Sequence, residues 1–156
     1  MKINLLAVGT KMPSWVEQGY EEYAKRLPRE CQLVLHEISP AKRTKNGHSQ
    51  QWLDQEGERI LASIPKEHYV VSLDVKGRPW STEQLAQQMK SWLADGRDIS
   101  LLIGGPDGLS KACNQRADQK WSLSALTLPH SLVRVVLAEQ LYRSWTVLQN
   151  HPYHRA

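Results

Sequence analysis

The sequence predicts a three-layer α/β domain with about five mostly parallel strands. Segments rich in β-branched and other apolar residues alternate with segments whose apolar residues recur every three or four positions. Strands separated by helices pair in parallel through right-handed crossovers, so this alternation favours one open sheet with helices on both faces. Because 156 residues is an ordinary size for one domain, we expect residues 1–156 to form a single domain.

The N-terminal half supplies two strands and two helices. A short apolar run over 3–8 predicts the first strand, and the alternating residues 32–38 predict the second. Between them, residues 13–27 place four apolar side chains on one helical face between two prolines. Residues 53–64 carry a second apolar stripe that also ends at a proline, which indicates the second helix.

The C-terminal half continues the alternation. The sequence predicts strands over 69–73, 99–103 and 121–127, a turn over 77–79, and helices over 81–93, from about 110, and over 132–148. Ser81 and Gln84 have the spacing of a capping box at a helix start. The segment Ile99–Ile103 is almost wholly apolar, which is typical of a strand covered on both faces.

Composition indicates a soluble, cytoplasmic protein. Apolar residues make up 40% and charged residues 23% of the chain, and neither a signal peptide nor a membrane-spanning run is expected. Cys31 and Cys113 lack metal-type spacing and are expected to be buried, inert thiols, and we expect no metal site. The net charge of +4 permits an acidic partner without requiring one.

Positive charge gathers in two places. The segment 40–48 carries three lysine and arginine residues and no acid, and the tail 151–155 is acid-free and holds an aromatic ring. Either segment suits nucleic-acid contact, and either is equally consistent with a solvated loop or a frayed chain end.

Three loops stand at the carboxyl ends of predicted strands, where ligands bind in open α/β sheets. They are 73–77, 104–108 and 123–129. Gly104 and Gly105 lack the β-carbons that would keep a ligand from the backbone, so their amides and carbonyls can meet an adenine or a ribose. The chain has no phosphate-binding glycine motif, and a tight turn without a ligand remains the alternative for this loop.

The last predicted helix is apolar around most of its circumference. One face can pack on the sheet, and the other needs a cover. A second copy of the chain is the simplest cover, which predicts a homodimer; a helix buried within one chain is the alternative.

Several motifs together closely resemble the SPOUT-class ribosomal RNA methyltransferases. The stretches 101–110, 123–130 and 134–143 carry the resemblance, and 7–12 with 150–155 extend it to both ends of the chain. The most similar group is the bacterial large-subunit rRNA pseudouridine N3-methyltransferase family. The resemblance implies a C-terminal trefoil knot, a homodimer, and methylation of a pseudouridine in 23S rRNA on the assembled ribosome, with S-adenosylmethionine as donor.

The resemblance also implies site residues. The donor would contact Leu73, Gly104 and the run Leu123, Ser124, Ala125, Leu126, Thr127 and Leu128, with Gly105 beside them in the glycine loop. Because the acceptor N3 must lose a proton, we consider three general bases, His154 first, then His130 and Glu139. Expected substrate contacts are phosphate binding by Arg134, Arg143 and Arg155, and stacking by Tyr153.

Structural roles compete with two of these assignments. Glu139 and Arg143 have the spacing of an intrahelical ion pair, and His130 stands where it can cap the last helix. A non-catalytic ribosome-binding or assembly protein suits the basic segments equally well but needs no donor pocket. A small-molecule methyltransferase would leave those segments unexplained.

Overall fold

A computed structural model describes residues 1–155, and of Arg155 the backbone alone. Its centre is one five-stranded sheet in the order β2-β1-β4-β3-β5, and every neighbouring pair is parallel. This confirms the predicted α/β class and strand number. The strands are β1 Lys2–Val8, β2 Gln32–Ile38, β3 Tyr69–Pro79, β4 Ile99–Ile103 and β5 Gln119–Ser122.

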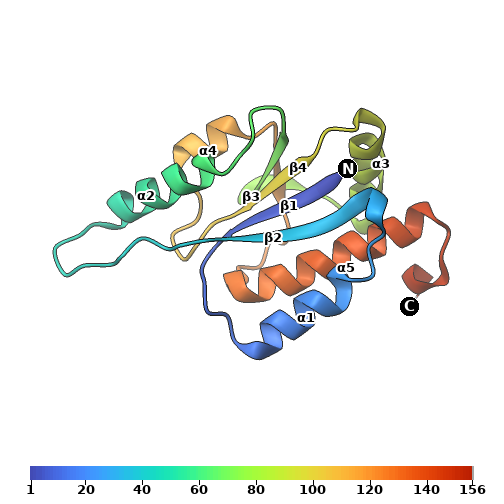
Figure 1. The fold of residues 1–156 in the computed structure, drawn as a ribbon, viewed down its shortest axis with the longest axis horizontal. Helices are drawn as coiled ribbons and strands as arrows, with labels where there is room; N and C mark the ends of the chain where they lie inside the picture. Colours follow the sequence, from blue (N-terminus) through green and yellow to red (C-terminus); the bar gives the residue numbers. More distant parts are fainter. Residues whose placement is uncertain (156) are drawn as a thin grey trace.

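Helices cover both faces of the sheet (Figure 1). Helices α1, α3 and α5 pack together on one face, and α2 and α4 cover the other. Two 3-10 turns, η1 and η2, complete the chain. The bounds are α1 Ser14–Ala24, η1 Arg29–Cys31, α2 Ser49–Ala62, α3 Thr82–Asp95, α4 Lys111–Arg116, α5 His130–Leu148 and η2 Pro152–Arg155.

The buried strands explain why both faces need helices. Alternate residues of β1 point to opposite sides, so Leu5 belongs to the core under α1, α3 and α5 while Leu6 belongs to the core under α2 and α4. The five residues of β4 are all buried, as expected for the central strand. Each face of the sheet therefore buries its apolar side chains under a layer of helices.

Local signals set several helix ends, and two of these, at Ser81 and Ser110, were predicted. The Ser81 side chain accepts the Gln84 amide hydrogen while the Gln84 side chain accepts the Ser81 amide hydrogen, which is the predicted capping box. Ser110 caps α4 by accepting from the amide of Cys113. Helix α3 ends at Gly96, whose φ of 83° is the left-handed conformation that glycine adopts without penalty.

The predicted strand over 121–127 is wrong beyond Ser122. Strand β5 ends there, and the chain leaves the sheet as a loop. Local hydrogen bonds replace the sheet ladder: the Ser122 hydroxyl donates to the Ser124 carbonyl, and the Ser124 hydroxyl accepts from the Leu126 amide. Serine side chains offer the backbone such alternatives to a strand, and the alternating apolar residues of 123–128 concealed them.

The predicted turn over 77–79 is also wrong, because the chain departs from the sheet earlier, over 74–77, and Arg78 and Pro79 pair with β5 again. Leu73 and Arg78 both pair with Trp121, so the four residues between them loop out of the sheet. Gly77 makes the return possible, because a β-carbon there would lie 2.7 Å from the Trp121 backbone. The excursion carries Asp74, Val75 and Lys76 above the sheet's carboxyl edge.

Cys31 and Cys113 are buried and free, as predicted. Burial raises the pKa of the Cys31 thiol to about 12.

Within residues 1–155, none of the helices is both long and apolar enough to cross a membrane. The trefoil knot implied by the resemblance stays a prediction.

Candidate functional site

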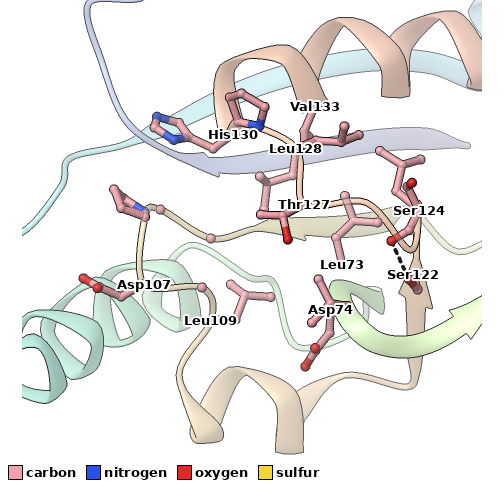
Figure 2. Close-up of a pocket in the computed structure, with 18 of the residues that line it drawn as sticks. Leu73, Asp74, Asp107, Leu109, Ser122, Ser124, Thr127, Leu128, His130 and Val133 are labelled. Carbon is pink, nitrogen blue, oxygen red and sulfur yellow. Dashed lines mark hydrogen bonds between the residues drawn. The ribbon is translucent and has the colours of Figure 1, made fainter.

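A cavity of about 560 Å³ opens at the carboxyl edge of the sheet. The ends of β3, β4 and β5 form its floor, and the first turn of α5 closes one side (Figure 2). This is where open α/β sheets bind ligands, and the volume lies within the range of about 300–1,000 Å³ usual for small-molecule sites. Three loops that are far apart in the sequence thus meet around one space.

Eight of the nine residues expected to contact the donor line this cavity. Leu73 comes from the end of β3, the two glycines follow β4, and the remainder lie in the loop between β5 and α5. Ala125, the ninth, is exposed and does not line it. The eight are Leu73, Gly104, Gly105, Leu123, Ser124, Leu126, Thr127 and Leu128.

The glycine loop is a tight turn whose geometry differs from the expected one. The Gly108 amide donates to the Gly105 carbonyl at 3.0 Å, with Pro106 and Asp107 between them. A β-carbon on Gly104 would lie 2.3 Å from the Gly108 carbonyl carbon and oxygen, so it would strike the loop's own backbone. Gly104 is therefore required to close the turn, and the expectation that it mainly clears space for a ligand needs this correction.

The cavity combines apolar walls with a few polar groups. Leucine side chains and Val133 of α5 supply the walls, while Asp74, Thr127 and Ser122 supply oxygen atoms (Figure 2). Sequence reasoning named no role for Ser122 or Val133. The over-long fifth strand hid Ser122, and nothing in the apolar pattern of α5 distinguishes Val133 from its neighbours.

His130 is the one candidate base that lines the cavity. It is the first residue of α5, the N-cap position belongs to Pro129, and no side chain caps the described helix. The capping alternative for His130 therefore has no support.

A second cluster lies between the C-terminal half of α5 and the tail. It consists of Glu139 and Arg143 of α5 and Tyr153 of η2. The Arg143 Nη2 atom lies 2.9 Å from Glu139 Oε2, which is the intrahelical pair considered above. The Tyr153 hydroxyl donates to the same oxygen at 2.7 Å, and its ring packs edge-on to Tyr142 at 4.7 Å. Burial and, next, the bond to Glu139 raise the pKa of Tyr153 to about 12. Glu139 is thus occupied by three partners, because the Gln140 side chain also donates to its Oε1 atom at 2.8 Å.

The tail folds back on the end of α5. His154 lies in η2, and its Nδ1 atom is buried without a hydrogen-bond partner among residues 1–155. Helix α5 has 19 residues and is about 28 Å long, with His130 at one end and the tail packed near the other (Figure 1). The tail therefore lies far from the cavity of its own chain, and the side chain of Arg155 falls outside the described part.

Arg134 is buried, with 2% of its surface exposed. Its guanidinium donates to Glu37 at 2.8 Å and to the Gly9 carbonyl at 2.9 Å. These bonds tie α5 to the ends of β1 and β2. A side chain so placed supports the fold and is not presented to a phosphate, so we leave it out of the proposed RNA contacts.

Comparison with known proteins assigns the family. A family model described as predicted SPOUT methyltransferase matches residues 1–154. The chain belongs to the SPOUT methyltransferase family. Two proteins named ribosomal RNA large subunit methyltransferase H are each 61% identical to it over 155 residues. The relative from Methylococcus capsulatus is matched over 99% of this chain and 100% of its own, and that from Hahella chejuensis over 99% of both.

A solved structure supports the SPOUT fold independently of close sequence similarity. The probable methylase family protein from Haemophilus influenzae aligns with a TM-score of 0.57 at 13% identity, over 97% of this chain and 69% of its own. At this identity the likeness concerns the fold alone. The SPOUT methyltransferase fold is thus indicated by both the sequence family and the backbone.

Proposed function

We propose that this SPOUT methyltransferase transfers a methyl group from S-adenosylmethionine to N3 of a pseudouridine in 23S rRNA of the assembled ribosome. The main support for this proposal is the cavity at the carboxyl edge of the sheet. In addition, the chain is 61% identical to a large-subunit rRNA methyltransferase over 99% of its length. Residues 1–156 would act as a single domain, in the cytoplasm where ribosomes are. A non-catalytic assembly protein needs no such cavity.

The residues present fit the donor. Leucine walls suit the faces of an adenine ring, and the Asp74 carboxylate with the Thr127 hydroxyl can bond ribose or amino groups. The donor supplies a methyl group on a positively charged sulfur. Among residues 1–155 no group of three or more His, Cys, Asp or Glu side chains is placed to hold a metal ion, and the proposed transfer requires none.

The residues of this chain have two tasks. The loops around the cavity hold the donor so that its methyl group points at the acceptor nitrogen, since in-line transfer depends on alignment. A base must accept the N3 proton of the acceptor. We assign this to His154 of the tail, with His130, which lines the cavity, as the alternative. Glu139 is a weaker candidate because Tyr153 and Arg143 already bind its carboxylate.

This assignment needs a second copy of the chain. The tail lies at the far end of α5 from its own cavity, so His154 can serve only the cavity of a partner. Val75 and Leu126 stand at the cavity rim 69% and 72% exposed, which is unusual for side chains of this size and provides an apolar surface for a partner. A two-fold dimer would give each cavity one partner tail.

Transfer of tritium from labelled S-adenosylmethionine tests the reaction. Assembled ribosomes, separate subunits and naked rRNA serve as acceptors, and the labelled nucleotide is mapped. We expect label in one large-subunit pseudouridine, with ribosomes as the best acceptor. Label in no RNA, from a protein that binds the donor, would contradict the proposed function.

Mixed dimers test the partner tail. One variant lacks residues 153–156, and the other carries Gly104→Ala in the cavity loop; at a donor concentration that barely occupies the Gly104→Ala cavity, each alone should have little activity. In an equal mixture of exchanged dimers, about a quarter of the wild-type rate should return, because half of the dimers are mixed and each has one intact site. No recovery, with exchange verified by mass spectrometry, would contradict a shared site.

A further inference from the structure

Arg43 bridges two elements at the edge of the donor cavity. It lies in the basic segment 40–48, which connects β2 to α2. Its Nη2 atom donates to Asp107 Oδ2 at 2.9 Å, and its Nη1 atom lies 3.5 Å from Glu56 Oε2. Asp107 belongs to the glycine loop, and its side chain points away from Leu73 and Thr127 (Figure 2). One guanidinium therefore joins the basic segment to the outside of the cavity wall.

The second partner, Glu56, fixes the bridge in place. Glu56 lies in α2 with 1% of its surface exposed, and its Oε2 atom also accepts the Ala41 amide at 2.9 Å. Its Oε1 atom has no partner within residues 1–155 and is 3.4 Å from where a β-carbon on Gly105 would stand. A buried carboxylate is costly unless it is paired, so Glu56 favours this position of Arg43. The pair between Arg43 and Asp107 lies at the surface, with side chains 35% and 32% exposed, so it is weak by itself and is the contact that bound RNA can strengthen.

The remainder of the segment faces outward. Lys42, Arg43 and Lys45 are all exposed, but only Arg43 has partners on the protein: its guanidinium also packs on the Trp52 ring, 4.9 Å from the ring centre. Gly47 lies so close to Trp52 that a β-carbon there would be 2.7 Å from the indole nitrogen. The segment thus divides its positive charges between two lysines available to phosphates and one arginine bound to the protein.

We propose that Arg43 is a positioning residue that couples RNA bound by Lys42 and Lys45 to the shape of the donor cavity. RNA that holds the segment also holds Arg43, and Arg43 holds the glycine loop through Asp107. Coupling between two sites is reciprocal, so bound donor tightens RNA binding by the same factor. The inference rests on the proposed function, since it presumes an RNA acceptor.

A double-mutant cycle on donor-site affinity tests the bridge. The probe is S-adenosylhomocysteine, the methyl-free product of the donor, and affinity is measured by calorimetry. We expect Asp107→Asn and Arg43→Gln each to weaken binding about fivefold, and the double variant to be no weaker than either, because both remove one interaction. Two independent losses that multiply to about twenty-five-fold, or no loss in either variant, would overturn the proposal.

Arg59→Gln is the matched control. Arg59 also tethers this connection to α2, by donating to the Ser39 carbonyl at 2.8 Å, but within residues 1–155 no hydrogen bond or ion pair links it to the glycine loop. Its replacement should leave S-adenosylhomocysteine affinity unchanged. Asp107→Asn keeps the Arg43–Glu56 pair, so it should fold with an unaltered unfolding midpoint and show a higher KM for the donor with kcat nearly unchanged at saturating donor.

Ribosomes provide the second arm of the test. They should tighten S-adenosylhomocysteine binding to the wild type, and this gain should be lost in Asp107→Asn. An equal gain in both proteins would refute the coupling while leaving the proposed function intact. A wild type that binds neither ribosomes nor S-adenosylhomocysteine would contradict the proposed function and this inference with it.

Discussion

Replacing Gly104 by alanine should open the cavity loop and weaken donor binding. The added methyl carbon would lie 2.3 Å from the Gly108 carbonyl carbon and oxygen, whereas non-bonded carbons rest at about 3.5–4.0 Å. Relief requires the backbone to move by more than about 1 Å, which breaks the Gly108–Gly105 hydrogen bond worth about 1 kcal/mol. We expect at least a tenfold loss of S-adenosylmethionine affinity, about 1.4 kcal/mol.

Alanine substitutions at three other glycines distinguish a steric clash in the loop from backbone strain and from a general loss of stability. Gly108→Ala meets open space but keeps a φ of 84°, so it should cost about 1–2 kcal/mol of backbone strain in the same loop. Gly105→Ala would approach Val8 to 3.1 Å and should cost less than Gly104→Ala. Gly96→Ala has the same left-handed strain at the end of α3, so it should lower the unfolding midpoint with unchanged donor affinity.

Calorimetry with the donor, and urea unfolding of each folded variant, measure these effects. The expected order of donor affinity is wild type and Gly96→Ala first, then Gly105→Ala, with Gly104→Ala last. Gly104→Ala that binds the donor as tightly as the wild type would show that the turn does not shape the cavity.

Three further outcomes follow from the contacts of α5 and its tail. Arg134→Ala should lower the free energy of unfolding by about 1–3 kcal/mol, since it removes the packing of a buried side chain and leaves the Gly9 carbonyl without its donor, while Glu37 stays exposed to water; an unchanged urea midpoint would refute this. Tyr153→Phe should cost about 1 kcal/mol below pH 10. Because folding raises the pKa of Tyr153 from 10.0 to about 12, this difference should vanish as pH rises through that window, and persistence above pH 12 would count against it. Deleting residues 153–156 should abolish methylation with less than about a threefold change in donor affinity; full activity would exclude the tail.

Much of the fold followed from local pattern. The Ser81 capping box and the apolar run of β4 depend on neighbouring residues, and the structure has them as predicted. The prolines locate helix ends less closely, because α1 ends at Ala24 and α2 at Ala62, each ahead of the proline that was expected to stop it. The two wrong segments have different causes. The return of β3 at Arg78 is set by pairing with Trp121 across the sheet, which no local pattern contains. The end of β5 at Ser122 is set by local serine hydrogen bonds, which the alternating apolar residues of 123–128 concealed.

The site divides in the same way. Loops after strand ends are recognisable in sequence, so eight of the nine expected donor contacts line the cavity, while Ala125 does not and the lining residues Ser122 and Val133 were not expected. The directions in which single side chains point were not predicted. Arg134 turns inward to Glu37, 97 residues away, and Arg43 reaches Asp107, 64 residues away. Nothing in the spacing of these charges reveals such pairs.

The position of β4 between β1 and β3 has a consequence for synthesis of the chain. Ile3 pairs with Ile99, so the first strand lacks a central neighbour until nearly two-thirds of the chain has been translated. Until then β1 and β2 can pair only with each other, and a two-stranded sheet is marginally stable in water. A nascent chain therefore spends most of its elongation with the apolar faces of β1 uncovered, and contacts so distant in sequence slow folding. Ribosome profiling combined with chaperone capture should find holdase binding up to the emergence of β4 and its release soon afterwards.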